Sequence, residues 1–206
     1  MKVTILGSAG QIGAYLTDYL KRQGHIVVEF DVVNADWQDM TRIPNINLHD
    51  ALSDTDFCFF LAFDVGGSRY LKKYQHTFDF IDNNSRIMVN AFQYLKKYRM
   101  PFVFASSQMS NMSYSPYGVL KRVGELYTKA LDGLIVKFWN VYGIEKMPIK
   151  HTSLLISFTK DLSLVSLKCS LMELKKGSSC MLKIVVKHWK LLCLTTKTSN
   201  QLMICT

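Results

Sequence analysis

Short apolar runs alternate with amphipathic stretches along residues 1–146 of this 206-residue chain. The amphipathic stretch after the first run carries apolar residues at helical spacing up to Gly24, which predicts a helix with a glycine at its C-terminal end. The short apolar runs are typical of buried parallel strands, and their alternation with helical stretches predicts an α/β fold. The runs predict strands at about 2–6, 25–30, 45–48, 57–62, 101–106 and 133–138.

A glycine-rich turn separates the first predicted strand from the first helix. Gly7, Gly10 and Gly13 stand there at spacings of three residues. Glycines permit a tight turn and the close approach of a pyrophosphate, which the N-terminus of the helix attracts. The second predicted strand ends at Asp31, near the position, about 20 residues on, of a ribose-binding carboxylate. This context predicts a Rossmann-type doubly wound parallel sheet that binds NAD, because Asp31 would repel the 2′-phosphate of NADP.

Tyr117 and Lys121 stand four residues apart, which places both side chains on one face of a helix. A free tyrosine has a pKa near 10 and transfers protons poorly at neutral pH. A nearby ammonium favours the phenolate, and bringing the pKa to about 7 would take roughly 4 kcal/mol. The pair therefore predicts an acid/base catalyst.

Residues 1 to about 146 resemble the extended short-chain dehydrogenase/reductase family, in its nucleotide-sugar epimerase/dehydratase branch. The resemblance covers the cofactor turn, two strand ends, a helix start, the Tyr-x-x-x-Lys pair and a later substrate-contacting segment. These matches are Gly7-x-x-Gly10-x-x-Gly13, 56–62, Asn84 with Asn90, 102–107, Tyr117-x-x-x-Lys121 and 140–143.

The resemblance implies a catalytic triad of Ser107, Tyr117 and Lys121, with Ser106 as the second choice for the hydroxyl. It implies substrate contacts by Gly66, Ser107 and Asn140, and no metal site follows from the cysteine and histidine spacing. The cofactor-binding residues that it implies are Gly7, Gly10, Gln11, Ile12, Gly13, Asp31, Leu61, Ala62, Phe63, Asn84, Ser106, Tyr117 and Lys121.

The implied function is an NAD-dependent epimerase/dehydratase that acts on a nucleotide sugar by transient hydride transfer. Gln108 and Met109 stand where dehydratases of the family usually place acids, which favours epimerisation or reduction. Lys137 stands near the place of an arginine that the family often has. A nucleotide-sugar reductase or dehydratase remains the alternative among enzymes, and an NAD-binding module without turnover remains the alternative of another class. The sugar and its base stay open.

Composition changes abruptly after residue 146. Residues 147–206 hold 9 Lys and 2 Asp or Glu, four of the five cysteines, one of the eleven glycines and no alanine. Back-translation of 147–160 and 171–192 in a frame shifted by one nucleotide permits helical sequences, the second of which resembles a later segment of the family. We therefore predict an NAD-binding domain at 1–146 and an out-of-frame tail at 147–206, which leaves the substrate lobe truncated and the chain's activity in question.

We predict no nucleic-acid partner despite the net charge of +9, because +7 of it lies in the tail. The chain has no apolar run of 18 or more residues, which predicts no membrane association. A single cysteine in residues 1–146 is expected of a cytoplasmic protein. The resemblance further implies a nucleotide-sugar substrate and a homodimer formed through two helices, one of which carries the Tyr-x-x-x-Lys pair.

Overall fold

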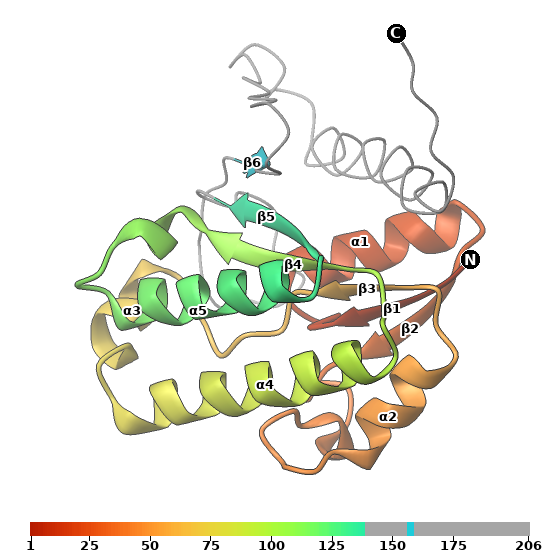
Figure 1. Ribbon diagram of the computed structural model, residues 1–206, viewed down its shortest axis with the longest axis horizontal. Coiled ribbons are helices and arrows are strands. Elements are labelled where there is room, and N and C mark those ends of the chain that lie inside the picture. Colours follow the sequence, from red (N-terminus) through yellow and green to blue (C-terminus); the bar gives the residue numbers. More distant parts are fainter. Residues whose placement is uncertain (139–155, 159–206) are drawn as a thin grey trace, which may run out of the picture. The chain divides into compact units, whose positions relative to one another are not determined.

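The computed structural model describes residues 1–138 and 156–158, in which strands and helices alternate (Figure 1). The strands are β1 (Lys2–Leu6), β2 (Ile26–Phe30), β3 (Phe57–Phe60), β4 (Phe102–Ser107), β5 (Leu134–Phe138) and β6 (Ile156–Phe158). The α-helices are α1 (Gln11–Arg22), α2 (Ile46–Ser53), α3 (Ser68–Tyr74), α4 (Phe78–Lys97) and α5 (Pro116–Ala130), and short 3₁₀ turns are η1 (Asp36–Gln38) and η2 (Gln108–Asn111).

The strands form one sheet in the order β2-β1-β3-β4-β5-β6. The first five are parallel, and β6 pairs with β5 in the antiparallel direction. The chain runs outward from β1 to β2 and then crosses back to β3, so the strand order reverses between β1 and β3. Helix α1 covers one face of the sheet, while α2, α4 and α5 lie on the other (Figure 1). The predicted Rossmann-type doubly wound fold is confirmed.

The centre of the sheet is buried on both faces. Every residue of β3 and of β4 is buried, as the continuous apolar runs predict. The rings of Phe92 and Phe104 each lie 5.2 Å from that of Phe60, centroid to centroid. A Cβ on Gly124 would lie only 2.3 Å from the ring of Phe104. The absence of a side chain at Gly124 therefore lets α5 pack closely against β4.

The strand predicted at 45–48 is wrong, because these residues begin α2 instead. Asn45 caps this helix, and its side-chain oxygen accepts a hydrogen bond from the backbone N–H of Leu48 at 3.0 Å. Leu48 and Leu52 are both buried, one helical turn apart. Leu48 and Leu52 therefore belong to the buried face of a helix. Because no strand forms here, β2 is the edge of the sheet among the described strands. At that edge, the side chain of Gln38 donates to the carbonyl of Glu29 at 3.3 Å and accepts from the N–H of Asp31 at 2.8 Å.

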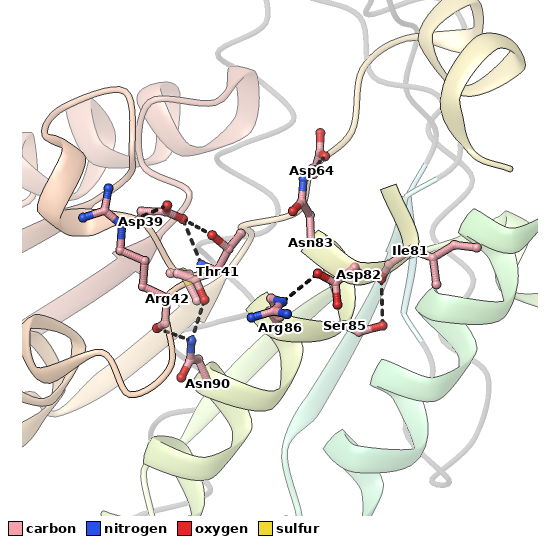
Figure 2. A network of polar contacts seen from close by, with 11 residues as sticks. Asp39, Thr41, Arg42, Asp64, Ile81, Asp82, Asn83, Ser85, Arg86 and Asn90 are labelled. Carbon is pink, nitrogen blue, oxygen red and sulfur yellow. Dashed lines mark hydrogen bonds and ion pairs between the residues drawn. The ribbon is translucent and has the colours of Figure 1, made fainter. Parts of the chain in front are cut away.

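Helix α4 holds the segment that leads into α2 (Figure 2). The buried amide of Asn90 donates to the carbonyls of Met40 and Arg42, at 2.6 and 2.9 Å. Asp39 accepts hydrogen bonds from both the N–H and the hydroxyl of Thr41, which turns the chain back on itself. This segment thereby keeps a fixed course without a strand.

No helix in the described part of the chain is both long enough and apolar enough to cross a membrane. The same residues contain no cluster of His, Cys, Asp and Glu side chains that could hold a metal ion. Of the predicted site residues, Asn140 lies outside the described ranges, as does nearly all of the predicted out-of-frame segment 147–206.

Candidate active site

The glycine turn joins the end of β1 to the start of α1. Gly7 has a φ of +88°, and a Cβ there would lie 2.6 Å from the backbone nitrogen of Ala62. A Cβ on Gly13 would lie 2.1 Å from the carbonyl oxygen of Gly7. On Gly10, a Cβ would meet that same oxygen at 3.4 Å and no other described atom within 4 Å. Gly7 and Gly13 are thus required by the packing of the chain on itself, whereas Gly10 leaves the backbone open to a ligand.

Asp31 follows β2 and lies against the glycine turn. One carboxylate oxygen accepts from the N–H of Ala9 at 3.0 Å, and the other accepts from the N–H of Val33 at 3.0 Å. A carboxylate offers about four acceptor positions, so this half-buried group keeps capacity for further hydroxyl donors. The structure therefore brings together the turn and the acid that sequence spacing placed near it.

The loop after β3 lies beside the turn, and Asn84 fixes its course. The N–H of Leu61 donates to the carbonyl of Leu6 at 2.9 Å, which joins the ends of β3 and β1. Asn84 is fully buried, accepts from the N–H of Asp64 at 2.7 Å and donates to the carbonyls of Asp64 and Phe80 at 3.0 and 2.8 Å. The amide predicted to contact the cofactor is therefore bound to the backbone of this loop and of its own helix.

The side chain of Asp64 ties the same loop to two helices. The hydroxyl of Tyr70 in α3 donates to one oxygen at 2.6 Å. Asn83 in α4 donates to the other oxygen at 3.2 Å. Figure 2 shows the side chains of Asp64 and Asn83. Gly66, predicted to contact substrate, lies in this loop, before the N-cap Gly67 of α3. The hydrogen bonds of Asp64 thus fix the position of this loop against α3 and α4.

Ser106 and Ser107 end β4 and, as neighbours in a strand, point to opposite faces of the sheet. The Ser106 hydroxyl donates to Glu125 at 2.6 Å. Ser107 interacts with the hydroxyl of Tyr117, which lowers the pKa of that tyrosine, and it accepts from the N–H of Met109 at 3.2 Å. This geometry favours Ser107 over Ser106 as the hydroxyl that works with Tyr117.

The start of α5 explains why Tyr117 reaches Ser107. Ser115 caps the helix by accepting from the N–H of Gly118 at 3.2 Å, and Pro116 occupies its first turn. A Cβ on Gly118 would lie 2.1 Å from the carbonyl oxygen of Met109, in the turn that follows Ser107. The glycine after Tyr117 therefore allows the contact between the helix and the end of β4.

Lys121 lies one turn beyond Tyr117 and is only 4% exposed. Its ammonium donates to the carbonyl of Ala105 at 2.7 Å. It also lies 3.7 Å from the ring centroid of Phe63 and 5.8 Å from that of Tyr117. The Phe63 and Tyr117 rings meet edge to face, with centroids 5.7 Å apart. Phe63, from the loop after β3, thus packs on both members of the pair.

The protonation of this pair differs from the sequence-based expectation. Burial raises the pKa of Tyr117 to about 12, while the interaction with Ser107 acts in the opposite direction. Burial also lowers the pKa of Lys121 to about 7, against the charge of Glu125, which raises it. The expected lowering of the Tyr117 pKa by Lys121 is therefore absent in this geometry, because burial removes water from both groups and the ammonium points to Ala105.

Sequence reasoning missed three features of the site. Phe63 was predicted only as a cofactor contact, and its ring contact with Lys121 and Tyr117 has no sequence signature. Gly118 carried a signal, since it directly follows the tyrosine predicted to be catalytic, in a helix, where glycine is unfavourable. Glu125 also carried one, because it stands four residues past Lys121 on the same helix face.

Comparisons with known proteins agree with this architecture. A family model described as the NAD dependent epimerase/dehydratase family matches residues 3–179. A search of curated proteins found no significant match. Similar solved structures include TunA, titled an NAD dependent NDP-hexosamine 5,6-dehydratase of tunicamycin biosynthesis, with 23% identity and a TM-score of 0.56, over 72% of this chain and 58% of TunA. They also include WbmH of Bordetella bronchiseptica in complex with NAD+, with 19% identity and a TM-score of 0.54, over 72% of this chain and 58% of WbmH.

The L780 UDP-rhamnose synthase of Acanthamoeba polyphaga mimivirus is similar too, at 16% identity and a TM-score of 0.53, over 68% of this chain and 56% of the synthase. The chain thus spans little more than half the length of these proteins, and at these identities they support the fold alone. The family match runs past residue 146 and so includes part of the segment predicted to be out of frame. It covers most of the chain, and the protein belongs to the NAD dependent epimerase/dehydratase family.

Proposed function

We propose that this chain carries the cofactor-binding and acid/base half of an enzyme that transforms a nucleotide sugar through transient hydride transfer to NAD. One observation carries the proposal: Ser107, Tyr117 and Lys121 meet at the carboxyl end of β4. The glycine turn and the loop after β3 end at the same edge of the sheet. In open parallel sheets, ligands bind at this edge, where the strand order reverses.

The residues around the turn fit a dinucleotide. The open backbone at Gly10 and the first amides of α1, at Gln11 and Ile12, would hold the pyrophosphate. Asp31 would accept hydrogen bonds from the adenosine ribose and disfavour a 2′-phosphate. Ala62 and Phe63 would lie beside the cofactor, while Lys121 would donate to the nicotinamide ribose through the ammonium protons not used by Ala105.

Bound NAD supplies the hydride acceptor, and the side chains of the chain manage the proton. Tyr117 would take the proton of a sugar hydroxyl as the carbon beneath it loses hydride, and would return it in the reverse step. Ser107, which interacts with the Tyr117 hydroxyl, would donate to the same sugar oxygen and stabilise its charge. A charged Lys121 would favour the phenolate form of Tyr117.

Epimerisation or reduction is favoured over dehydration among the outcomes of this chemistry. Gln108 and Met109 follow Ser107 in η2 and supply no carboxylate for eliminating water. The second candidate function is an NAD-binding module without turnover. The pKa of about 12 at Tyr117 favours that candidate for as long as burial keeps the phenol protonated.

Cofactor binding is tested first, by titrating NADH and NADPH into the protein and following nicotinamide fluorescence. We expect saturable binding of NADH and weaker binding of NADPH. An absence of NADH binding would refute the assignment of the glycine turn and Asp31. Catalysis is then tested with UDP-, GDP- and dTDP-sugars against Tyr117→Phe. Turnover that the variant retains in full would remove the triad from the proposal, and NADH binding without turnover would favour the module.

The division of the chain at residue 146 is part of the proposal. A shifted reading frame accounts for the change in composition after that residue. Sequencing the gene across codons 143–150 in independent isolates tests it. An uninterrupted frame with the same tail in all isolates would refute the division, and the family match to residue 179 would then describe a continuous domain.

A further inference from the structure

Glu125 is a buried carboxylate on the helix that carries Tyr117 and Lys121. Its side chain belongs to α5, and the residue is 1% exposed. One oxygen accepts from the Ser106 hydroxyl at 2.6 Å and lies 3.0 Å from the Lys137 ammonium, so β4 and β5 both reach it. The other oxygen accepts from Arg122 at 3.0 Å. Lys137 also donates to Ser110 in η2 at 2.9 Å. Three elements that surround the site are therefore joined through one carboxylate.

This carboxylate stays charged at neutral pH. Burial by itself raises the pKa of Glu125. Hydrogen bonds with Ser106, Ser110 and Lys137, together with the charge of Lys137, outweigh that effect and hold the pKa below its ordinary value. The charged groups that face Glu125 are Lys121 and Arg122 on its own helix and Lys137 on β5. The helix thus carries a fixed negative charge one turn from Lys121.

Glu125 and Lys121 fasten α5 to two consecutive residues of β4. Lys121 donates to the carbonyl of Ala105, and Ser106 donates to Glu125. Both contacts lie next to Ser107, on the strand that delivers it to Tyr117. The lysine is almost fully buried, which disfavours its ammonium form, and the charge of Glu125 one turn away acts against that effect.

We propose that Glu125 is a positioning residue, whose buried carboxylate, one turn along α5 from Lys121, favours the ammonium form of that lysine beside Tyr117. The role assigned to Lys121 rests on the proposed function, whereas its charge state is a property of the protein alone. The charge of Glu125 opposes the effect of burial on Lys121. Without it, Lys121 would be largely neutral at pH 7, because burial alone would then set its pKa.

The test measures the protonation of Lys121 in the full chain labelled with ¹³C-lysine, with no cofactor or substrate present. The Lys121 signal is assigned by its loss in Lys121→Met, and its ¹³Cε shift is followed against pH. In Glu125→Gln, which keeps the shape of the side chain, we expect the midpoint to fall by about 1 pH unit. Asp82→Asn is the matched control, because its exposed pair with Arg86 lies on α4 (Figure 2). The control leaves the Lys121 midpoint unchanged.

A double variant separates the charge effect from lost stability. Glu125→Gln leaves the half-buried Lys137 without its charged partner, which destabilises the protein. Adding Lys137→Met removes both charges, so the free energy of unfolding recovers, while the Lys121 midpoint stays below that of the wild type. An unchanged midpoint in Glu125→Gln, or a midpoint that recovers together with stability, would overturn the proposal. NADH titration of the wild type tests the proposed function separately.

Discussion

The ammonium of Lys121 lies 3.7 Å from the ring centroid of Phe63, closer to that ring than to the ring of Tyr117. An aromatic side chain from the loop after β3 therefore covers the lysine of the proposed catalytic pair. Burial is the main cause of the low pKa of Lys121. The access of water to this amine thus controls how much of Lys121 is protonated at neutral pH.

Phe63→Ala is expected to raise the pKa of Lys121. The change loses a cation–π contact of about 2 kcal/mol or more, which acts in the opposite direction. Desolvation outweighs that contact, since it moves the pKa from 10.5 to about 7. The ¹³Cε titration of Lys121 measures the result. Phe78→Ala, at a side chain that is 79% exposed, is the control and leaves the titration unchanged. A lower midpoint in Phe63→Ala would show that the ring supports the charge rather than excluding water.

Lys121 should make stability depend on pH. In the unfolded chain its pKa is near 10.5, and in the folded chain it is about 7. Between these values the unfolded state binds more protons, so the free energy of unfolding rises with pH. We expect Lys121→Met to flatten the rise between pH 7 and about pH 9.5, worth on the order of 3 kcal/mol. Urea unfolding at several pH values measures it. Above about pH 10 the raised pKa of Tyr117 acts in the opposite direction, because the unfolded tyrosine ionises first. Equal slopes in the variant and the wild type would contradict the prediction.

Gly10 and Gly13 should separate cofactor binding from folding. Gly13→Ala places a Cβ 2.1 Å from the Gly7 oxygen, so we expect severe destabilisation in thermal unfolding. Gly10→Ala meets that oxygen at 3.4 Å, and at a helix N-cap the change costs on the order of 0.5 kcal/mol. The Gly10 variant should fold and bind NADH about tenfold more weakly, because the methyl group occupies the approach to the backbone. Unaltered NADH affinity in Gly10→Ala would place the pyrophosphate elsewhere.

Asn84→Ala should loosen the loop after β3. The variant leaves the N–H and carbonyl of Asp64 and the carbonyl of Phe80 without the partner they now have, at a cost of about 2–3 kcal/mol. Hydrogen exchange of residues 61–66 should speed up, and the midpoint of urea unfolding should fall. Asn83→Ala is the matched control, since it removes a single half-buried hydrogen bond of 3.2 Å. Similar effects of the two variants would mean that the loop is held by other contacts.

The parts of the site that depend on local sequence were predictable. The turn at Gly7–Gly13 and the Asp31 carboxylate follow from backbone geometry and spacing, and the structure places them together. The predicted strand at 45–48 failed because two apolar residues in so short a stretch fit a strand or a helix equally well, and the capping bond of Asn45 favours the helix. The protonation of Tyr117 and Lys121 could not be predicted. It depends on water excluded by Phe63 and on the charge of Glu125, and both depend on packing in three dimensions.

The side chain of Gln38 has a consequence for the behaviour of the protein in solution. Its amide meets the outward-facing carbonyl of Glu29 and the N–H of Asp31, as the backbone of one residue in a neighbouring strand would. An exposed strand edge is a template on which other chains add and aggregate. Gln38 occupies part of that template at β2, so a single amide protects the sheet from growing beyond its own edge.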